Sequence, residues 1–463
     1  METNTTICAI ATSPGNGAIA VIRLSGNHAV SITDKLFKSP SGKHLGKQAP
    51  NTIHFGSIYF KDKLIDEVLV SLFKAPHSYT GEDVVEISCH GSTFIQQKML
   101  QVLTESGATL AKPGEFTLRA FMNGKMDLSQ AEGVADLIAS ESEAAHKMAM
   151  NQMRGGFSAE IGKLRNQLLH LCSLLELELD FSEEDVEFAN RTDLKHLVNE
   201  ILMVIRHLTD SFSLGNVIKT GVPVAIVGKP NVGKSTLLNT LLQEEKAIVS
   251  EIAGTTRDAI EDVINIQGIR FRFIDTAGIR QTTDTIESLG IERTFSKISA
   301  ASVILLLTDA RSSKEEIQQQ VEELKLSGDQ HLILIINKID LYSEPEVVRR
   351  LGGKDAFSNY PVLFLSAKHH LHTDQLHEIL LQTVQTKALQ TSDVVVSNVR
   401  HYEALKSALA ASERAMVGLD TSLPSDLIAQ DIREILHYLG QITGEITTDE
   451  ILGNIFKNFC IGK

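Results

Sequence analysis

At residues 228–235 the chain reads Gly-Lys-Pro-Asn-Val-Gly-Lys-Ser, which fits the pattern G-x-x-x-x-G-K-[ST] at every fixed position. The apolar residues 222–227 before it predict a buried strand, and residues 236–242 after it predict a helix. Glycines let such a loop wrap around an anion, and its backbone amides supply partial positive charge together with the helix N-terminus. Lys234 is expected to neutralise β- and γ-phosphates, and the Ser235 hydroxyl to bind Mg²⁺. The flanks and the Lys-Ser pair disfavour a chance glycine-rich turn.

The chain has 463 residues, which is too long for one hydrophobic core and suggests about three domains. Its 43% hydrophobic and 22% charged residues are ordinary for a soluble globular protein. The first residues lack the features of a signal peptide, and no apolar run is long enough to span a bilayer. We therefore expect a cytoplasmic protein without a membrane partner.

The formal net charge of −14 argues against a generic nucleic-acid coat, which would be basic. It leaves open a specific RNA client bound by a local basic patch. The four cysteines are scattered without C-x-x-C spacing, so neither a zinc site nor a disulfide framework is expected: they are Cys8, Cys89, Cys172 and Cys460.

A second motif, Asn337-Lys338-Ile339-Asp340, follows the apolar residues 332–336 and selects the base. The Asp340 carboxylate can accept hydrogen bonds from N1–H and the 2-amino group of guanine. Adenine has neither donor, and would leave the carboxylate unpaired at a cost of about 1–3 kcal/mol. Asn337 and Lys338 are expected to brace the phosphate loop and cover the base. Ser366-Ala367-Lys368 is expected to give a backbone N–H to the guanine oxygen, so the motifs together predict a GTPase.

Two further stretches are typical of nucleotide-dependent switches. Asp275-Thr276-Ala277-Gly278 follows a predicted strand over 271–274, and we expect Asp275 to hold Mg²⁺ through water and the Gly278 amide to sense the γ-phosphate. Gly254-Thr255-Thr256-Arg257-Asp258 lies where a switch loop supplies a threonine to Mg²⁺, and we expect Thr256 to be that ligand.

Ile279 occupies the position of the water-orienting glutamine of the Ras pattern. An apolar side chain cannot orient water, so another polar group must do so. A cation could replace the charge of an arginine finger, because catalysis of phosphoryl transfer is chiefly electrostatic. The polar candidates in the following loop are Arg280, Gln281, Asp284 and Glu287.

The flanks of the nucleotide-binding region differ in pattern. Residues 1–120 predict a mixed α/β unit with strands at 19–24 and 84–89, and residues 221–386 alternate strand and helix as in a parallel sheet. Residues 121–220 and 387–463 are predominantly helical. Their apolar stripes predict helix packing and are Leu164, Leu168, Leu171 and Leu175; Ile428, Ile432, Ile435 and Leu439; and Leu452, Ile455, Phe456 and Phe459. The acidic residues 176–187 are expected to form a solvated surface.

These motifs closely resemble those of the tRNA-modification GTPase family MnmE (TrmE), over the whole chain. The phosphate loop with Asn231, residues 254–258, the run 275–280 and the terminal Phe459-Cys460-Ile461-Gly462-Lys463 all fit. The resemblance implies a folate-binding and dimerising α+β N-terminal domain at 1–120 and a Ras-like GTPase domain at 221–386. It also implies that the GTPase domain is inserted between two parts of a helical domain, at 121–220 and 387–463.

The resemblance also implies the activity. The family acts with the FAD-dependent partner MnmG, as a heterotetramer built on a homodimer, on C5 of the wobble uridine of certain tRNAs. It adds an aminomethyl or carboxymethylaminomethyl group, taking a one-carbon unit from 5-formyl- or 5,10-methylene-tetrahydrofolate. GTP hydrolysis drives the conformational cycle and is activated by K⁺-dependent dimerisation of the GTPase domains.

By position, the resemblance gives further residues a role. Arg23, Glu86, Lys125 and Lys463 match folate contacts, although the first three would otherwise be taken for surface or ion-pair residues. Asn231, Ser250, Ile252 and Thr255 match K⁺ ligands, and Ser235 and Thr256 match Mg²⁺ ligands. Glu287 matches the catalytic glutamate that orients water, and Cys460 a cysteine required for modification, where chemistry alone would favour a small buried side chain. The expected GTP contacts are Asn231, Val232, Gly233, Lys234, Ser235, Thr236, Ser250, Glu251, Ile252, Ala253, Gly254, Thr255, Thr256, Asp275, Thr276, Ala277, Gly278, Asn337, Lys338, Asp340, Ser366, Ala367 and Lys368.

Two alternatives remain. The chain could be a regulatory or ribosome-assembly GTPase without modification chemistry, or its helices could be a scaffold for partners. A ribosome-assembly factor would more often carry a basic RNA-binding module. The helical tracts here are acidic and end in Cys460-Ile461-Gly462-Lys463, which favours the modification GTPase.

Overall fold

The computed structural model of the chain describes residues 5–180, 191–246, 262–274, 301–327, 330–342, 344–353, 357–383, 394–421, 423–457 and 459–462. The chain folds into two units. Unit 1 comprises residues 1–139, 149–207 and 403–463, and unit 2 comprises residues 140–148 and 208–402. Unit 2 is therefore inserted into unit 1 along the sequence, while the domain boundaries expected at residues 120, 220 and 386 stay predictions.

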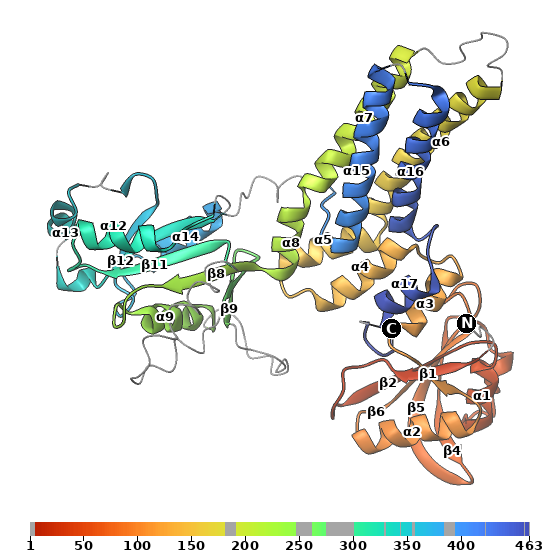
Figure 1. Cartoon of the computed structure of the whole chain (residues 1–463). Coiled ribbons are helices and arrows are strands. Elements are labelled where there is room, and N and C mark those ends of the chain that lie inside the picture. Colours follow the sequence, from red (N-terminus) through yellow and green to blue (C-terminus); the bar gives the residue numbers. More distant parts are fainter. Residues whose placement is uncertain are drawn as a thin grey trace. The chain divides into compact units, whose positions relative to one another are not determined.

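Unit 1 begins with a mostly antiparallel sheet whose strand order, in the described residues, is β3-β4-β5-β6-β2-β1-β7. Helix α2 packs against strands β1, β2, β5 and β6, and Ile22, Val70 and Met99 are among the residues of the core. The predicted strands at 19–24 and 84–89 are confirmed as β2 and β6. The elements are β1 (Ile7–Ile10), β2 (Ile19–Ser25), α1 (Ala29–Leu36), β3 (Phe37–Lys38), η1 (Leu45–Lys47), β4 (Thr52–Phe60), β5 (Lys63–Phe73), β6 (Val84–His90), α2 (Thr93–Glu105) and β7 (Thr109–Leu110) (Figure 1).

Three helices of unit 1 share a second, smaller core. Helix α3 (Glu115–Met122) contacts α4 (Leu128–Ala139) and the C-terminal helix α17 (Asp449–Phe456). The apolar stripe predicted from Leu452 to Phe459 lies in this core, but α17 ends at Phe456 and Phe459 packs from beyond the helix. The C-terminal residues are thus folded against α4, far from them in sequence.

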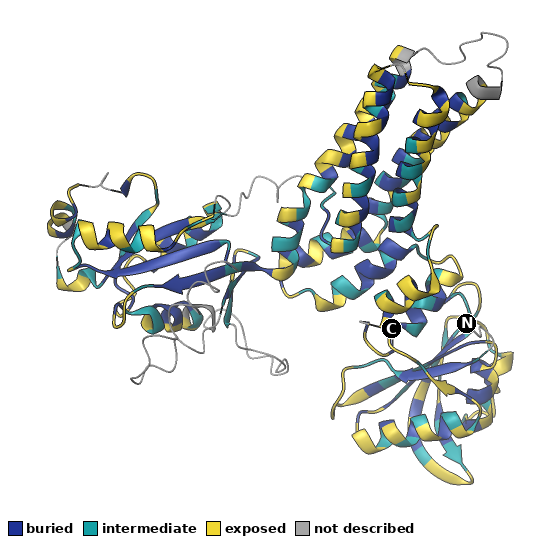
Figure 2. Cartoon of the chain, viewed as in Figure 1, coloured by how far each residue is buried: buried dark blue, intermediate teal, exposed yellow. Residues whose placement is uncertain are grey.

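The remaining long helices of unit 1 are joined by their apolar faces and by ion pairs. They are α6 (Gly156–Asp180), α7 (Arg191–Asp210), α15 (Val399–Asp420) and α16 (Ser425–Thr443). The preceding helix α5 (Glu143–Met153) has residues in both units. The predicted stripes on α6 and α16 are buried, whereas the outer faces are exposed (Figure 2). Arg433 of α16 pairs with Glu176 of α6, and Arg206 of α7 pairs with Glu413 of α15. Glu176 is exposed, as expected for the acidic segment, of which residues 181–187 lie outside the described residues.

Unit 2 is a doubly wound α/β fold. Its sheet, in the described residues, has the order β13-β12-β11-β8-β10-β9, and only β9 runs antiparallel to its neighbour. Strand β11 is buried along its whole length, as expected for a parallel strand covered on both faces. The elements are α8 (Phe212–Thr220), β8 (Val222–Val227), α9 (Lys234–Lys246), β9 (Asp262–Ile266), β10 (Ile269–Phe273), β11 (Val303–Asp309), α12 (Lys314–Glu323), β12 (His331–Asn337), η3 (Ile339–Leu341), α13 (Glu344–Arg350), β13 (Val362–Leu365) and α14 (Thr373–Thr383).

Each face of this sheet has its own core. Leu237 of α9 and Leu376 of α14 pack on one face, while Ile317 of α12 and Val347 of α13 pack on the other. The predicted class, a Ras-like parallel-sheet domain with helical and α+β parts, is confirmed. In the described part of the chain, no helix is long and apolar enough to cross a membrane.

Candidate functional site

The phosphate loop joins strand β8 to helix α9, and its backbone requires glycine at two positions. Gly228 has φ +148°, and a Cβ there would lie 2.2 Å from the Leu307 carbonyl oxygen. Gly233 has φ +104°, and a Cβ there would lie 2.3 Å from Asn337 Nδ2. Asn231 is left-handed at φ 62°, a conformation that asparagine tolerates better than most residues. The sequence pattern therefore reflects close approach of β11 and β12 to the loop.

Lys234 begins helix α9, and its side chain folds back over the loop. The Nζ atom donates hydrogen bonds to the carbonyl oxygens of Gly228 and Lys229 at 2.7 and 2.9 Å. Ser235 and Thr236 follow in the first turn of α9, where the helix dipole favours an anion. The loop thus has a cation, a helix N-terminus and a hydroxyl at the carboxyl end of a parallel strand, where ligands of such folds bind.

Asn337, at the end of β12, holds two loops together. Its Nδ2 atom donates to the Val232 carbonyl oxygen at 2.8 Å, and its Oδ1 atom accepts from the Ala367 backbone N–H at 3.0 Å. Asn337 is 3% exposed, so both hydrogen bonds are shielded from bulk water. Thr240 of α9 also donates to the Ala367 carbonyl oxygen at 2.8 Å. The phosphate loop and the 366–368 loop are therefore fixed relative to each other.

Lys338, in the guanine motif 337–340, contacts the phosphate loop. Its Nζ atom donates to the Asn231 carbonyl oxygen at 2.7 Å and to Asp309 Oδ2 at 2.8 Å. Hydrogen bonds from Arg311, with those from Lys338 acting in the same direction, hold the pKa of Asp309 well below its usual range. Sequence reasoning missed Asp309; the available signal was a carboxylate at the end of a strand that begins with the apolar run 303–307, the position of polar ligand-site residues in parallel sheets.

Asp340 lies in the turn η3, with its carboxylate next to the 366–368 loop. Oδ1 accepts a hydrogen bond of 2.5 Å from the Ser366 hydroxyl, and Oδ2 lies 3.7 Å from His369 Nε2. Ser366 and Ala367 are buried, whereas Lys368 is exposed. The structure thus brings together the phosphate loop, residues 337–340 and residues 366–368. The predicted site residues at 250–256, 275–278 and Glu287, and the loop candidates Arg280, Gln281 and Asp284, lie outside the described residues.

A second cluster of predicted residues lies in unit 1. Arg23 and Glu86 are directly opposite each other on β2 and β6, and Arg23 Nε and Nη2 lie 2.9 and 2.8 Å from Glu86 Oε1. The guanidinium also lies over two rings, with Cζ 5.3 Å from the centroid of Tyr79 and 5.8 Å from that of Phe116. Aromatic faces attract such a cation. The Arg23 guanidinium is therefore positioned by the ion pair with Glu86 and by the rings of Tyr79 and Phe116.

The C-terminal residues lie against this cluster. Arg23 Nη1 donates to the Gly462 carbonyl oxygen at 3.2 Å, and the Gly114 N–H donates to the Cys460 carbonyl oxygen at 3.4 Å. Gly462 has φ +95°, and a Cβ there would lie 2.3 Å from the Ile10 carbonyl oxygen. Cys460 is exposed, so the alternative of a small buried side chain is wrong. Lys463 lies outside the described residues.

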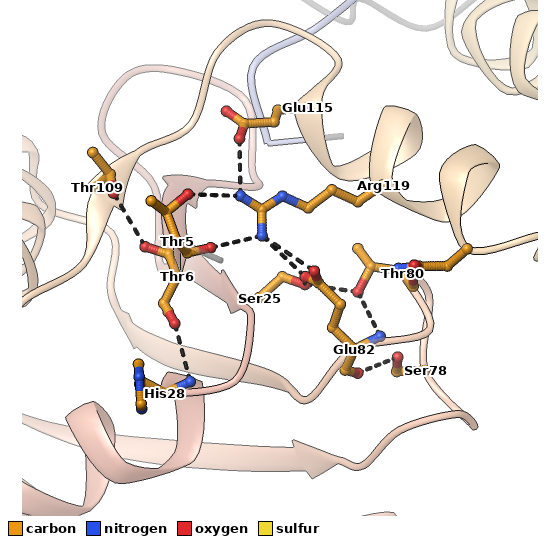
Figure 3. A network of polar contacts seen from close by, with 11 residues as sticks. Thr5, Thr6, Ser25, His28, Ser78, Thr80, Glu82, Thr109, Glu115 and Arg119 are labelled. Atoms are coloured by element: carbon orange, nitrogen blue, oxygen red, sulfur yellow. Dashed lines mark hydrogen bonds and ion pairs between the residues drawn. The ribbon is translucent and has the colours of Figure 1, made fainter. Parts of the chain in front are cut away.

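Lys125 lies on a neighbouring loop. Its Nζ atom donates to the Pro76 carbonyl oxygen at 3.0 Å, which ties it to the segment that carries Tyr79. Sequence reasoning also missed Arg119, whose buried guanidinium binds Glu82 and Glu115 (Figure 3). The signal was an arginine three residues after Phe116 on the apolar face of α3.

Two family models together match most of the chain. Residues 6–125 match the family described as GTP-binding protein TrmE N-terminus, and residues 128–460 match the MnmE helical domain. The chain is 56% identical over 461 residues to the tRNA modification GTPase MnmE of Flavobacterium johnsoniae, covering 99% of each chain. The chain belongs to the MnmE family of tRNA modification GTPases. The MnmE proteins of Flavobacterium psychrophilum and Bacteroides thetaiotaomicron are 55% and 54% identical to it, each with 99% of both chains covered.

A solved G domain of FeoB from Methanococcus jannaschii covers 35% of this chain and 96% of its own, at 24% identity. Its TM-score is 0.25, too low to add to the MnmE assignment. The predicted site residues of this chain occupy both units: the nucleotide motifs lie in unit 2, and the Arg23 cluster with the C-terminal residues lies in unit 1.

Proposed function

We propose that this chain uses GTP hydrolysis to drive modification of C5 of the wobble uridine in tRNA, together with the FAD-dependent partner MnmG. The added group is an aminomethyl or carboxymethylaminomethyl group, and its one-carbon unit comes from 5-formyl- or 5,10-methylene-tetrahydrofolate. The observation that carries this proposal is the contact of the C-terminal Cys460–Gly462 segment with the Arg23 and Glu86 pair. A GTPase that only regulates assembly has no need of a thiol held at such a site.

The nucleotide part of the proposal rests on the contacts of unit 2. The amides of residues 231–236 and the Lys234 ammonium bind the phosphates, and Asp340 accepts the two donors of guanine. Ser366 already donates to that carboxylate, so the side chain is oriented before the base arrives. Lys338 covers the base while its Nζ atom holds the Asn231 carbonyl. Ser250 to Thr256 and Asp275 to Gly278 complete the nucleotide contacts in this proposal.

Oxygen-bearing residues of the phosphate loop and of the stretch 250–256 suit two cations, Mg²⁺ and K⁺. Ser235 and Thr256 offer hydroxyl oxygens to Mg²⁺, which prefers oxygen ligands and substrate phosphates. Asn231, Ser250, Ile252 and Thr255 offer neutral amide, hydroxyl and carbonyl oxygens, the type of donor that binds K⁺. Asn231 is exposed with its backbone fixed by Lys338, which leaves its side-chain amide available. When bound, K⁺ supplies positive charge where an arginine finger would act.

Glu287 is the proposed residue for water activation. Ile279 cannot orient water, and a carboxylate can accept a hydrogen bond from it and align it with the γ-phosphate. Asp275 would hold Mg²⁺ through water and the Gly278 amide would sense the γ-phosphate, so the motif 275–278 would link the bound nucleotide to the switch.

The folate part uses unit 1. Arg23, Lys125 and Lys463 provide positive charge for the folate carboxylates, and Glu86 provides acceptors for the pterin donors. Cys460 is exposed beside this group and is required for the modification step. The working assembly is a homodimer, which forms a heterotetramer with MnmG.

A reconstituted reaction tests this proposal. The purified chain, MnmG, an unmodified tRNA, 5,10-methylene-tetrahydrofolate, glycine or ammonium, GTP, Mg²⁺ and K⁺ are combined, and the tRNA is digested to nucleosides. The expected result is a C5-modified wobble uridine that disappears when the folate or the chain is left out. A wobble uridine modified equally without the folate would overturn the folate part.

A further inference from the structure

A buried arginine lies at the junction of two loops of unit 1. The Arg119 side chain is 9% exposed, and its Nη1 atom donates to the Thr5 carbonyl oxygen at 2.7 Å (Figure 3). Nη1 also donates to both oxygens of Glu82, at 3.3 and 3.2 Å, and Nη2 donates to Glu115 Oε1 at 3.0 Å. A guanidinium can bind several acceptors at once because its donors form a rigid, planar fork.

Glu82 connects Arg119 to the loop that faces Arg23. Its Oε2 atom also accepts a hydrogen bond of 2.7 Å from the Ser25 hydroxyl, and Ser25 lies two residues after Arg23 on the same face of β2. The segment 76–82 ends at this carboxylate and carries Tyr79. Because Arg119 and Ser25 hold Glu82, they also hold the segment that carries Tyr79, whose ring packs against the Arg23 guanidinium.

Glu115 connects Arg119 to the loop that contacts the C-terminus. Its Oε2 atom accepts a hydrogen bond of 2.8 Å from the Lys112 N–H, which closes the turn 112–115. Gly114 in this turn donates to the Cys460 carbonyl oxygen. A Cβ on Gly114 would lie 2.9 Å from Phe459 Cβ, so the turn and the C-terminal segment are in close contact.

We propose that Arg119 is a positioning residue. It fixes the segment 76–82, which carries Tyr79, relative to the turn 112–115, and so places Arg23 and Cys460 for the same substrate. This rests on the proposed function, because the substrate in question is the folate. The two carboxylates have distinct effects. Glu82 fixes the segment that carries Tyr79 over Arg23, and so affects folate binding. Glu115 fixes the turn that contacts the C-terminal segment, and so affects the position of Cys460. A lysine at position 119 has its three donors on one nitrogen, so it cannot reproduce the separate bonds that Nη1 makes to Glu82 and Nη2 makes to Glu115.

The experiment compares the full-length chain with its Arg119→Lys, Glu82→Gln and Glu115→Gln variants. Glutamine keeps the shape of glutamate but places an N–H₂ group against the donors of Arg119, Lys112 or Ser25. The matched control is Arg414→Lys, because Arg414 also binds two carboxylates, Asp431 and Glu434, between α15 and α16. The readouts are the equilibrium affinity for 5-formyl-tetrahydrofolate, the alkylation rate of Cys460 by iodoacetamide, the GTPase rate and the melting temperature.

The expected result is a division of effects that general destabilisation would not produce. Arg119→Lys weakens folate binding by about tenfold and raises the Cys460 alkylation rate by about threefold, well below its melting temperature. Glu82→Gln weakens folate binding while alkylation stays within about twofold of wild type, and Glu115→Gln does the reverse. The GTPase rate and the Arg414→Lys control stay unchanged.

The inference would be overturned if Arg119→Lys kept the folate affinity and the Cys460 alkylation rate of the wild type. It would also be overturned if Glu82→Gln and Glu115→Gln changed both readouts equally, in proportion to the fall in their melting temperatures. If Arg119→Lys does not fold, the two glutamine variants decide the question. A wild-type chain that binds no folate would instead refute the folate part of the proposed function, and the alkylation rates would then decide the positioning of Cys460 by themselves.

Discussion

The Nη1 atom of Arg23 donates a hydrogen bond to the carbonyl oxygen of Gly462, 439 positions later in the chain. One guanidinium therefore binds both the Glu86 carboxylate of the sheet and the backbone of the C-terminal segment. The close approach of Gly462 to Ile10 explains why glycine stands at this position. The exposed Cys460 is thereby kept at the end of the N-terminal sheet.

The four cysteines should differ in reactivity. Burial raises the pKa of the Cys8 and Cys89 thiols to about 11, and burial also raises the pKa of Cys172. Because the thiolate is the reactive form, these residues should resist iodoacetamide at pH 8, while the exposed Cys460 is alkylated at least about tenfold faster. Peptide mass spectrometry of a time course measures this. Equal labelling of Cys8 and Cys460 in the folded chain would contradict the difference in burial between the two thiols.

Guanine selection should depend on the Asp340 carboxylate. Asp340→Asn replaces an acceptor with a donor at the 2-position of the base, so GTP affinity should fall by about tenfold to a hundredfold. Xanthosine triphosphate, which carries a carbonyl oxygen at that position, should bind the variant better than the wild type. Titration of the wild type and of Asp340→Asn with GTP and with xanthosine triphosphate measures this change in nucleotide preference. Unchanged GTP affinity in Asp340→Asn would place the guanine contact elsewhere.

Hydrolysis should depend on the monovalent cation. The neutral oxygens of Asn231, Ser250, Ile252 and Thr255 suit K⁺, so the GTPase rate in KCl should exceed the rate in NaCl by about tenfold or more at equal ionic strength. Asn231→Ala should remove the difference, since one ligand is lost. The rate is measured as phosphate release with Mg²⁺ constant. Equal rates in the two salts would exclude the assigned K⁺ site.

Glu287 should be needed for turnover but not for binding. Glu287→Ala removes the carboxylate proposed to orient water, so the GTPase rate should fall by about a hundredfold while the affinity for GTP stays within about threefold. Asp284→Ala, three positions earlier in the sequence, is the matched control and should remain active. If the two variants lose activity equally, or Asp284→Ala alone loses it, the assignment is wrong.

The sequence predicted the parts of the molecule that follow local rules. Strands β8 and β12 are apolar runs, and the buried stripes of α6 and α16 follow the helical period; these patterns arise from burial itself. The guanine motif was also predictable, because Asp340 and its neighbours lie close together in sequence. The helix α17 was predicted too long, since Phe459 packs with the same core from outside the helix.

Long-range polar partners could not be predicted in this way. Nothing in the local sequence pairs Asp309 with Lys338 or Glu82 with Arg119, because these pairs form only when distant segments meet. Glu115 and Arg119 differ, since they are four positions apart on α3 and that spacing can be seen in the sequence. The role of Cys460 came only from the family resemblance, since a lone cysteine has no spacing to interpret. The pairing of Arg23 with Glu86 required the register of β2 and β6.

The most direct test of the account is mass spectrometry of wobble nucleosides from cells in which the gene for this chain is deleted and replaced by the wild-type or the Cys460→Ser gene. The account predicts that the deletion loses the C5 modification, that the wild type restores it, and that Cys460→Ser does not restore it. The purified Cys460→Ser chain should keep its GTPase rate within about twofold, because the nucleotide site lies in unit 2. Normal C5-modified wobble uridines in the deletion strain would contradict the account.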